Sequence, residues 1–402
     1  MLKLVRKLVE RAQGLLPTTG FYFDSPLVLF QSDDWGRVGL RDHEGLEQLQ
    51  AAGLALGERP YDLYSLETAE DLAALRAVLM RHHDSSGRHP AIQMNFILAN
   101  LDFAKMSECG FREIHLLPLT EGLPQGWSRP GLLEAYREGI AAGVFHPALH
   151  GMTHFCQSAM ERAMTAQGDR AALLRTLWRA GTPYIHWRMP WIGYEYWDPE
   201  MPEDERFLPA ETQRQMIGQA VGAYAKLFGM LPRSACAPGY RANGDTLRAW
   251  AQHGIHAAQN GSDGPVPPYF DRHGVLHLTR TVEFEPAMVG FSVGACLERA
   301  ERCFEQGVPA IVSVHSINFH STVRDFRTPT VQLLEEFLGA LEAKRPDLLY
   351  LHDEDLYQLV TGGSYPAAGG NAADESVQSD RVKVNVTRRS FTRAGTTRRQ
   401  KA

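Results

Sequence analysis

The sequence has few cysteines, no excess of positive charge and no long apolar run, and each shortage excludes a class of protein. Its five cysteines are scattered over 402 residues without a Cys-x-x-Cys pair, which argues against a disulfide framework or a zinc knuckle and indicates a reducing compartment. The formal net charge is −6, whereas nucleic-acid binding requires a basic face, so we expect no nucleic-acid partner. No segment has the roughly 20 apolar residues of a transmembrane helix, and we expect a cytoplasmic protein.

Two nucleotide-binding motifs are also missing. No glycine-rich turn of the dinucleotide-binding kind follows an expected strand, and there is no P-loop lysine. What is present is a chain with 44% hydrophobic and 22% charged residues, enough for a full-sized core. Short β-rich runs alternate with helical patterns from residue 26 to about 360. This alternation predicts an α/β fold in one domain, 26–361, with seven to eight mostly parallel strands closed into a (β/α) barrel.

The two ends of the chain depart from this pattern. Residues 1–17 spread four cations between apolar residues at helical spacing, without the apolar core of a signal peptide, so we expect an amphipathic helix within residues 1–25. That helix packs either on the domain's own surface or, as a peripheral contact, on an anionic membrane. Residues 362–402 lose periodicity and carry eight Lys or Arg after Asp380, which predicts a disordered basic tail.

Polar residues fall where the expected strands end, the edge at which α/β folds place their active sites. The stretch "VLFQSDDWG" (28–36) runs from apolar residues into two adjacent carboxylates, Asp33 and Asp34. Neighbouring like charges at the end of a buried strand raise the cost of burying either one. The pair therefore indicates a cation nearby.

Histidines follow two other expected strands. "FHPALHGMTHF" supplies His146, His150 and His154, and "PAIVSVHSINF" supplies His315. Four residues of strand span about 13 Å, too far for one metal, whereas a turn brings side chains four apart within about 6 Å. If Gly151 turns the chain, His150 and His154 form the chelating pair. His146 then lies on the strand, four residues before His150. We expect it to line the pocket or to contact a ligand instead of binding the metal.

Two imidazoles and a carboxylate form a facial ligand set that suits zinc or another divalent transition metal. The alternative is that these histidines are separately hydrogen-bonded residues of polar strand ends. Potential metal ligands follow three of the expected strands, and this coincidence favours the metal site.

These motifs resemble the polysaccharide deacetylase superfamily, also known as the NodB-homology or carbohydrate esterase 4 group. The likeness extends over residues 26 to about 355, and "SDDWG", "FHPALHGMTH", "LTRTVEFEP" and "PAIVSVHSINF" are similar to a bacterial branch of it. The resemblance implies a distorted (β/α) barrel and hydrolysis of an N-acetyl group on a carbohydrate. We expect the substrate to be a precursor in surface-polysaccharide assembly. It also implies one divalent metal ion, which we expect to be zinc, with cobalt, nickel or manganese as alternatives.

The resemblance also implies roles for individual residues. Asp33 matches the general base that takes a proton from the metal-bound water, Asp34 matches the metal-ligating carboxylate, and His315 matches the general acid. His150 and His154 complete the metal set, and a backbone N–H near Tyr240 matches a second oxyanion donor. Residues expected to bind substrate or to support the site are Trp35, His146, Pro238, Tyr240, Arg241, Arg280 and Asn318.

The sequence departs from the family's pattern at three places. Trp35 stands where glycine is usual, Ala235 or Cys236 stands where an arginine usually holds the base, and "TRTVEFEP" (279–286) replaces an Asp-and-Trp motif. Three arginines are alternatives for the missing partner of Asp33: Arg188, Arg241 and Arg280. The departures leave two other functions open, hydrolysis of a different amide or ester and a catalytically silent carbohydrate-binding scaffold.

An aromatic segment, "YIHWRMPWIGYEYWDP" (184–199), contains three tryptophans and three tyrosines. Such rings over a barrel mouth stack on sugars, or they bury a long connection. The sequence leaves both interpretations open.

Overall fold

The structure is a computed structural model, and it describes residues 18–166, 168–185, 189–367 and 381–391. Its centre is a curled sheet in which eight strands run parallel in the order β11, β12, β2, β3, β6, β7, β8, β10, and a ninth, the short β13 (Leu349–Tyr350), pairs in parallel with β2. Their bounds are β2 (Leu27–Trp35), β3 (Ile92–Ile97), β6 (Phe145–Gly151), β7 (Ser234–Cys236), β8 (Ala257–Gly261), β10 (Leu276–Arg280), β11 (Val282–Glu283) and β12 (Ala310–His315).

The segment that contains β10 and β11 joins the two ends of this sheet. Strand β10 pairs with β8 along five residues, and directly after it Thr281 N donates to Ile311 O at 3.0 Å. Val282 then pairs with Val312 of β12. The predicted distorted (β/α) barrel is therefore confirmed, and all nine residues of β2 are buried, as expected for a strand covered on both faces.

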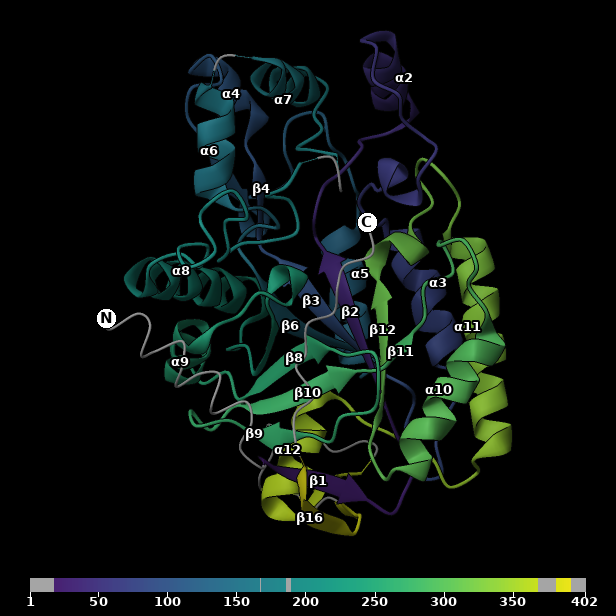
Figure 1. The fold of residues 1–402 in the computed structure, drawn as a ribbon. Coiled ribbons are helices and arrows are strands. Elements are labelled where there is room, and N and C mark those ends of the chain that lie inside the picture. Colours follow the sequence, from purple (N-terminus) through teal and green to yellow (C-terminus); the bar gives the residue numbers. More distant parts are fainter. Residues whose placement is uncertain (1–17, 167, 186–188, 368–380, 392–402) are drawn as a thin grey trace.

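Helices cover the outside of the barrel (Figure 1). They are α3 (Ala69–Leu79), α5 (Leu132–Ala141), α8 (Ala210–Phe228), α9 (Gly244–Gln252), α10 (Val293–Glu305), α11 (Arg327–Lys344) and α12 (Asp353–Gly362). A second group lies beyond the C-terminal ends of the strands, at the top of Figure 1: α2 (His43–Ala51), α4 (Phe103–Glu108), α6 (Gln157–Thr165) and α7 (Asp169–Arg179). This second group builds a cap with its own apolar cluster beside the barrel mouth.

The two ends of the described chain pair with each other, at the bottom of Figure 1. Strand β1 (Thr18–Phe23) is antiparallel to β16 (Val386–Phe391), and it contacts the short strand β9 (Tyr269–Phe270). The helix expected within residues 1–25 is thus wrong for 18–23, while residues 1–17 lie outside the described part.

The disordered tail is also wrong where the structure describes it. Strand β14 (Ser364–Pro366) pairs with β15 (Arg381–Lys383), and β16 follows; residues 368–380 and 392–402 lie outside the described part. Val382, Val384 and Val386 alternate with polar residues and pack on the apolar cluster beside β1. That period of two is a strand signal, which the basic composition obscured.

Within the described residues, none of the helices has both the length and the apolar character that crossing a membrane requires.

Candidate metal centre and active site

The two aspartates sit on an irregularity of β2. Pairing with β3 is regular up to Ser32, skips Asp33 and Asp34, and resumes at Trp35, while Asp34 adopts a left-handed conformation with φ of 76°. In a regular strand, neighbouring side chains point to opposite faces; the bulge instead lets both carboxylates reach His150. A left-handed non-glycine residue costs about 1–3 kcal/mol and persists only where its surroundings hold it.

Two hydroxyl groups hold this strained turn. The backbone oxygen of Asp34 accepts hydrogen bonds from Tyr64 Oη at 2.7 Å and from Ser316 Oγ at 3.3 Å. Two residues further on, Gly36 N donates to the buried carboxylate of Glu67 at 2.8 Å.

The expected metal ligands converge at the ends of β2 and β6. One ligand atom each from Asp34, His150 and His154 lies within 4.8 Å of the others, and all three residues are buried. Asp34 Oδ1 is 3.0 Å from His154 Nε2 and 3.8 Å from His150 Nε2. His150 Nδ1 is 2.8 Å from Cys236 O, a contact that assigns the proton to Nδ1 and turns Nε2 toward Asp34.

The polar atoms of this cluster fit a divalent cation. Asp34 is 1% exposed and His150 is 2% exposed, yet neither Asp34 Oδ1 nor His150 Nε2 has a hydrogen-bond partner among the described residues. Leaving buried polar atoms unpaired costs about 1–3 kcal/mol each. Two nitrogens and one carboxylate oxygen match the donor set of catalytic zinc sites.

Arg37 fixes the other oxygen of Asp34. Its guanidinium is 3.1 Å from Asp34 Oδ2, lies 3.8 Å over the ring of Tyr64, and donates to Tyr184 Oη at 3.1 Å. The sequence reasoning missed Arg37, although it stands three residues after Asp34.

Asp33 is held by a different arginine. Arg280 donates to Asp33 Oδ2 at 2.6 Å and to Oδ1 at 2.7 Å, and Asn95 adds a bond to Oδ1 at 2.7 Å. Burial alone would raise the pKa of Asp33, but the attraction of Arg280, with His150 and His315, outweighs it and holds that pKa far below its usual range. Asp33 is therefore ionised, and both its oxygens are occupied.

A second group of potential ligands, Asp33, His150 and Cys236, also lies within 4.8 Å. It does not suit a metal, because Arg280 already occupies Asp33 and burial raises the pKa of the Cys236 thiol well above its ordinary value. The set with Asp34 is the candidate metal centre.

Among the three arginines that the sequence left open, Arg280 is the one paired with Asp33. It is 1% exposed, and its remaining donors bond to Gln31 at 3.0 Å and Gln259 at 2.6 Å. Arg241 instead lies 4.6 Å over the ring of Trp197, and Arg188 lies outside the described residues.

His315 lies beside Asp33, its register partner on the neighbouring strand. Its Nδ1 is 2.6 Å from Glu285 Oε1, and its Nε2 is 3.9 Å from Asp33 Oδ2. Burial lowers the pKa of His315, but the attraction and hydrogen bond of Glu285, together with Asp33 and Asp34, raise it to about 9. The ring is 30% exposed, so a substrate can reach it.

Asn318 orients this pair, since it donates to Glu285 Oε2 at 2.6 Å. Glu285 was not among the expected site residues. Its signal was present in "VEFEP", five residues after Arg280, so one segment of the chain supplies the partners of both Asp33 and His315.

Two expected residues lie away from the reacting centre. Trp35 is fully buried, donates to Ser32 Oγ at 2.8 Å and stacks on Phe319, so it supports the bulge from behind. His146 lies at the start of β6 against the ring of His352, at the end of the strand away from His150. The expectation that it lines the site is wrong, because an extended strand carries it about 13 Å away.

The backbone oxyanion donor expected in the turn at Pro238–Tyr240 stays a prediction. Tyr240 N donates to Ala237 O at 2.8 Å and Arg241 N donates to Pro238 O at 3.3 Å, so this 3-10 turn uses both amides itself. The ring of Tyr240 is nearer the site, since Arg280 contacts its hydroxyl at 3.3 Å.

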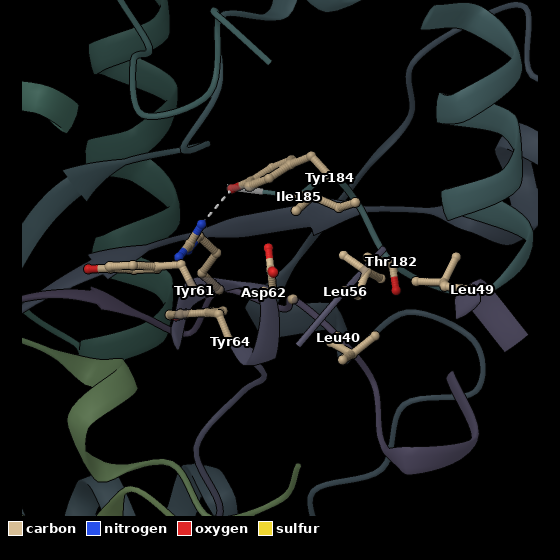
Figure 2. A pocket seen from close by; sticks show the side chains of 11 residues that line it. Leu40, Leu49, Leu56, Tyr61, Asp62, Tyr64, Thr182, Tyr184 and Ile185 are labelled. Atoms are coloured by element: carbon tan, nitrogen blue, oxygen red, sulfur yellow. Dashed lines mark hydrogen bonds between the residues drawn. The ribbon is translucent and has the colours of Figure 1, made fainter. Parts of the chain in front are cut away.

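A small cavity lies behind Arg37 and the tyrosines around it (Figure 2). Its volume is about 20 Å³, room for a group of about the size of one water molecule, so it does not take a sugar ring. Figure 2 shows the rings of Tyr61, Tyr64 and Tyr184 at one end and Leu49 and Thr182 at the other. The side chain of His315, by contrast, is 30% exposed.

The aromatic segment mainly buries its own connection. Trp191 and Tyr196 are fully buried, and Tyr184 faces the cavity. Trp197 is partly exposed and lies under Arg241. Trp187 lies outside the described residues.

No protein-family model matches the chain, and no curated protein matches it. Several solved structures are similar in fold. One is described as a probable polysaccharide deacetylase from Pseudomonas aeruginosa PAO1, with 11% identity over 84% of this chain and 93% of that one and a TM-score of 0.45. Another is a family 4 carbohydrate esterase from Streptomyces lividans in complex with acetate, with 10% identity over 82% and 92% and a TM-score of 0.34.

A third similar structure is a family 4 pseudoenzyme from Bacillus anthracis, with 9% identity over 81% of this chain and 63% of that one and a TM-score of 0.35. Likeness at this level concerns the fold and does not determine the function.

Proposed function

We propose that this protein is a metal-dependent hydrolase that removes an N-acetyl group from a carbohydrate. The observation that carries the proposal is the placement of three units at one barrel mouth. They are a ligand set of two histidines and a carboxylate, an ionised Asp33 held by Arg280, and a protonated His315 held by Glu285. Asp34, His150 and His154 would hold the metal.

A divalent metal at these ligands supplies a Lewis acid that polarises the acetyl carbonyl and makes water acidic enough for a weak base to deprotonate. Asp33 acts as that base. Because its pKa is depressed, Asp33 is too weak a base to deprotonate ordinary water. Its position beside the ligand set is therefore important, since a bound cation would make the water more acidic.

His315 delivers a proton to the departing amine. An amine leaves readily only when protonated, and the Glu285 carboxylate keeps the imidazole charged at neutral pH. Because Glu285 occupies Nδ1, the proton on Nε2 is the one that faces Asp33 and the reaction. Hydrolysis of another amide would use the same groups. Hydrolysis of an ester would depend less on a general acid that stays protonated, as His315 does.

The catalytically silent scaffold has no use for this arrangement. Two adjacent buried carboxylates, each with a dedicated arginine, carry a desolvation cost that sugar binding alone does not require.

The proposal is tested by the metal content of the purified protein, followed by deacetylation assays. We expect about one equivalent of a divalent transition metal in the wild type and little in a His150→Ala/His154→Ala variant. N-acetylated mono- and oligosaccharides are then screened for release of acetate, with Asp33→Asn as the blank. Absence of metal after incubation with zinc, cobalt, nickel or manganese would exclude this mechanism.

A further inference from the structure

The turn that joins His150 to His154 is held from behind by a buried carboxylate. Glu195 is 1% exposed, and its Oε1 accepts hydrogen bonds from Met152 N at 2.8 Å and Thr153 N at 3.1 Å. These are two of the three residues between the histidines. One oxygen atom therefore fixes the direction of two consecutive peptide groups in the turn.

Glycine at position 151 makes this approach feasible. Gly151 has a φ of 122°, and a Cβ atom there would collide with the Glu195 carboxylate. Only glycine combines that backbone conformation with so close a neighbour.

The segment that carries Glu195 also bonds to the chain around His154. Gly193 N donates to His154 O at 2.9 Å, and Cys156 N donates to Trp191 O at 3.0 Å. Residues 191–195 thus bond to the backbone before His154, at His154 itself, and after it at Cys156. The two imidazole rings that this turn presents lie 5.3 Å apart between centroids, tilted by 43°.

We propose that Glu195 is a positioning residue that sets the spacing of His150 and His154 for the metal. The inference rests on the proposed function, since it concerns the same metal centre. Glu195 does not touch the ligands; it acts through the amides of Met152 and Thr153. Groups that orient metal ligands from behind typically contribute 10–100-fold to metal affinity.

Two conservative variants separate reach from charge. Glu195→Gln keeps an acceptor oxygen at the same distance but removes the charge, and Glu195→Asp keeps the charge but withdraws the oxygens by one methylene. We expect Glu195→Asp to weaken zinc binding at least tenfold and Glu195→Gln to weaken it less than threefold, measured by competition with a chromophoric chelator.

Asp84→Ala is the matched control. Asp84 is a buried carboxylate that also accepts backbone N–H groups, from Ser86 at 2.8 Å, Arg88 at 2.9 Å and Tyr350 at 2.9 Å, in a loop that contributes nothing to the metal centre. We expect it to lower the melting temperature of the metal-free protein and to leave zinc affinity within threefold of wild type. A loss of stability alone would then not explain the effect of Glu195→Asp.

The outcomes are distinct. Loss of affinity in Glu195→Gln but not in Glu195→Asp would show that charge matters and would overturn the inference, as would equal losses in both or no loss in either. If Glu195→Asp does not fold, a tenfold or greater loss in Glu195→Gln would overturn it. A wild type that binds no metal would instead refute the proposed function.

Discussion

Replacing Glu285 by glutamine should move the basic limb of the pH–rate profile. Glutamine keeps an acceptor for His315 Nδ1 but removes the negative charge of Glu285. Burial lowers the pKa of His315, and that charge is the main cause that raises it to about 9. We expect the pKa of His315 to fall toward the ordinary value of about 6.5. At pH 8 the protonated fraction would drop from about 90% to about 3%, roughly a 30-fold loss of kcat/KM, whereas at pH 6 the loss would be less than about twofold.

The assay is kcat/KM for deacetylation between pH 5.5 and 9.5, since this parameter reports ionisation of the free enzyme. Glu283→Gln is the control, because Glu283 lies on the same segment, its side chain is 43% exposed, and its carboxylate faces Arg299 at 3.6 Å rather than His315. It should leave the profile in place. A basic limb that stays near pH 9 in Glu285→Gln would refute the role of Glu285.

Three further predictions concern the supporting residues. Arg280→Leu should destabilise the protein by about 3–5 kcal/mol in urea unfolding at pH 7, because it leaves Asp33 buried without its partner. Since Arg280 depresses the pKa of Asp33, this contribution is complete above the unfolded pKa of about 4 and declines from there down to the much lower folded pKa, so the loss should be smaller but still present at pH 3, and an equal loss there would contradict it. Arg37→Met should weaken zinc binding by about tenfold by releasing Asp34 Oδ2, and an unchanged chelator competition curve would contradict that. Val384→Asp should release β16 and speed hydrogen exchange in β1, with no effect on zinc affinity; slow exchange in β1 would contradict the packing seen here.

The parts of the fold that depend on hydrophobic pattern could be predicted from the sequence. Strands such as β2 and β12 contain apolar runs, Leu27–Phe30 and Ala310–Val312, and these runs alternate with helical patterns along the chain. The first and last strands could not be predicted in the same way. Their pairing joins segments far apart in the sequence, and the basic residues of β16 resemble those of a solvated tail.

For the site, motif spacing predicted the pair of His150 and His154, because a turn after β6 is a local feature, whereas Asp34 was expected as the third ligand from the family resemblance. The partners of Asp33 and His315 depend on how the barrel closes, so the sequence left three arginines open and missed Glu285. Strand geometry excluded His146 from the ligand set, and the same extended spacing takes it away from the site, where a pocket wall or a partner of a ligand was expected.

The pairing of β1 with β16 has a consequence for biosynthesis. Thr18 pairs with Phe391, so 373 residues separate the two partners, the difference of their numbers. At a translation rate of about 5–20 residues per second, β1 emerges about 20–75 s before its partner strand is made. Its other backbone partners among the described residues are also made late, since Gly20 pairs with Tyr269 and the amides of Phe21 and Phe23 donate to Pro268 O and Gly307 O. A nascent chain therefore carries an open strand edge, and this edge is where ribosome-associated chaperones have most to protect.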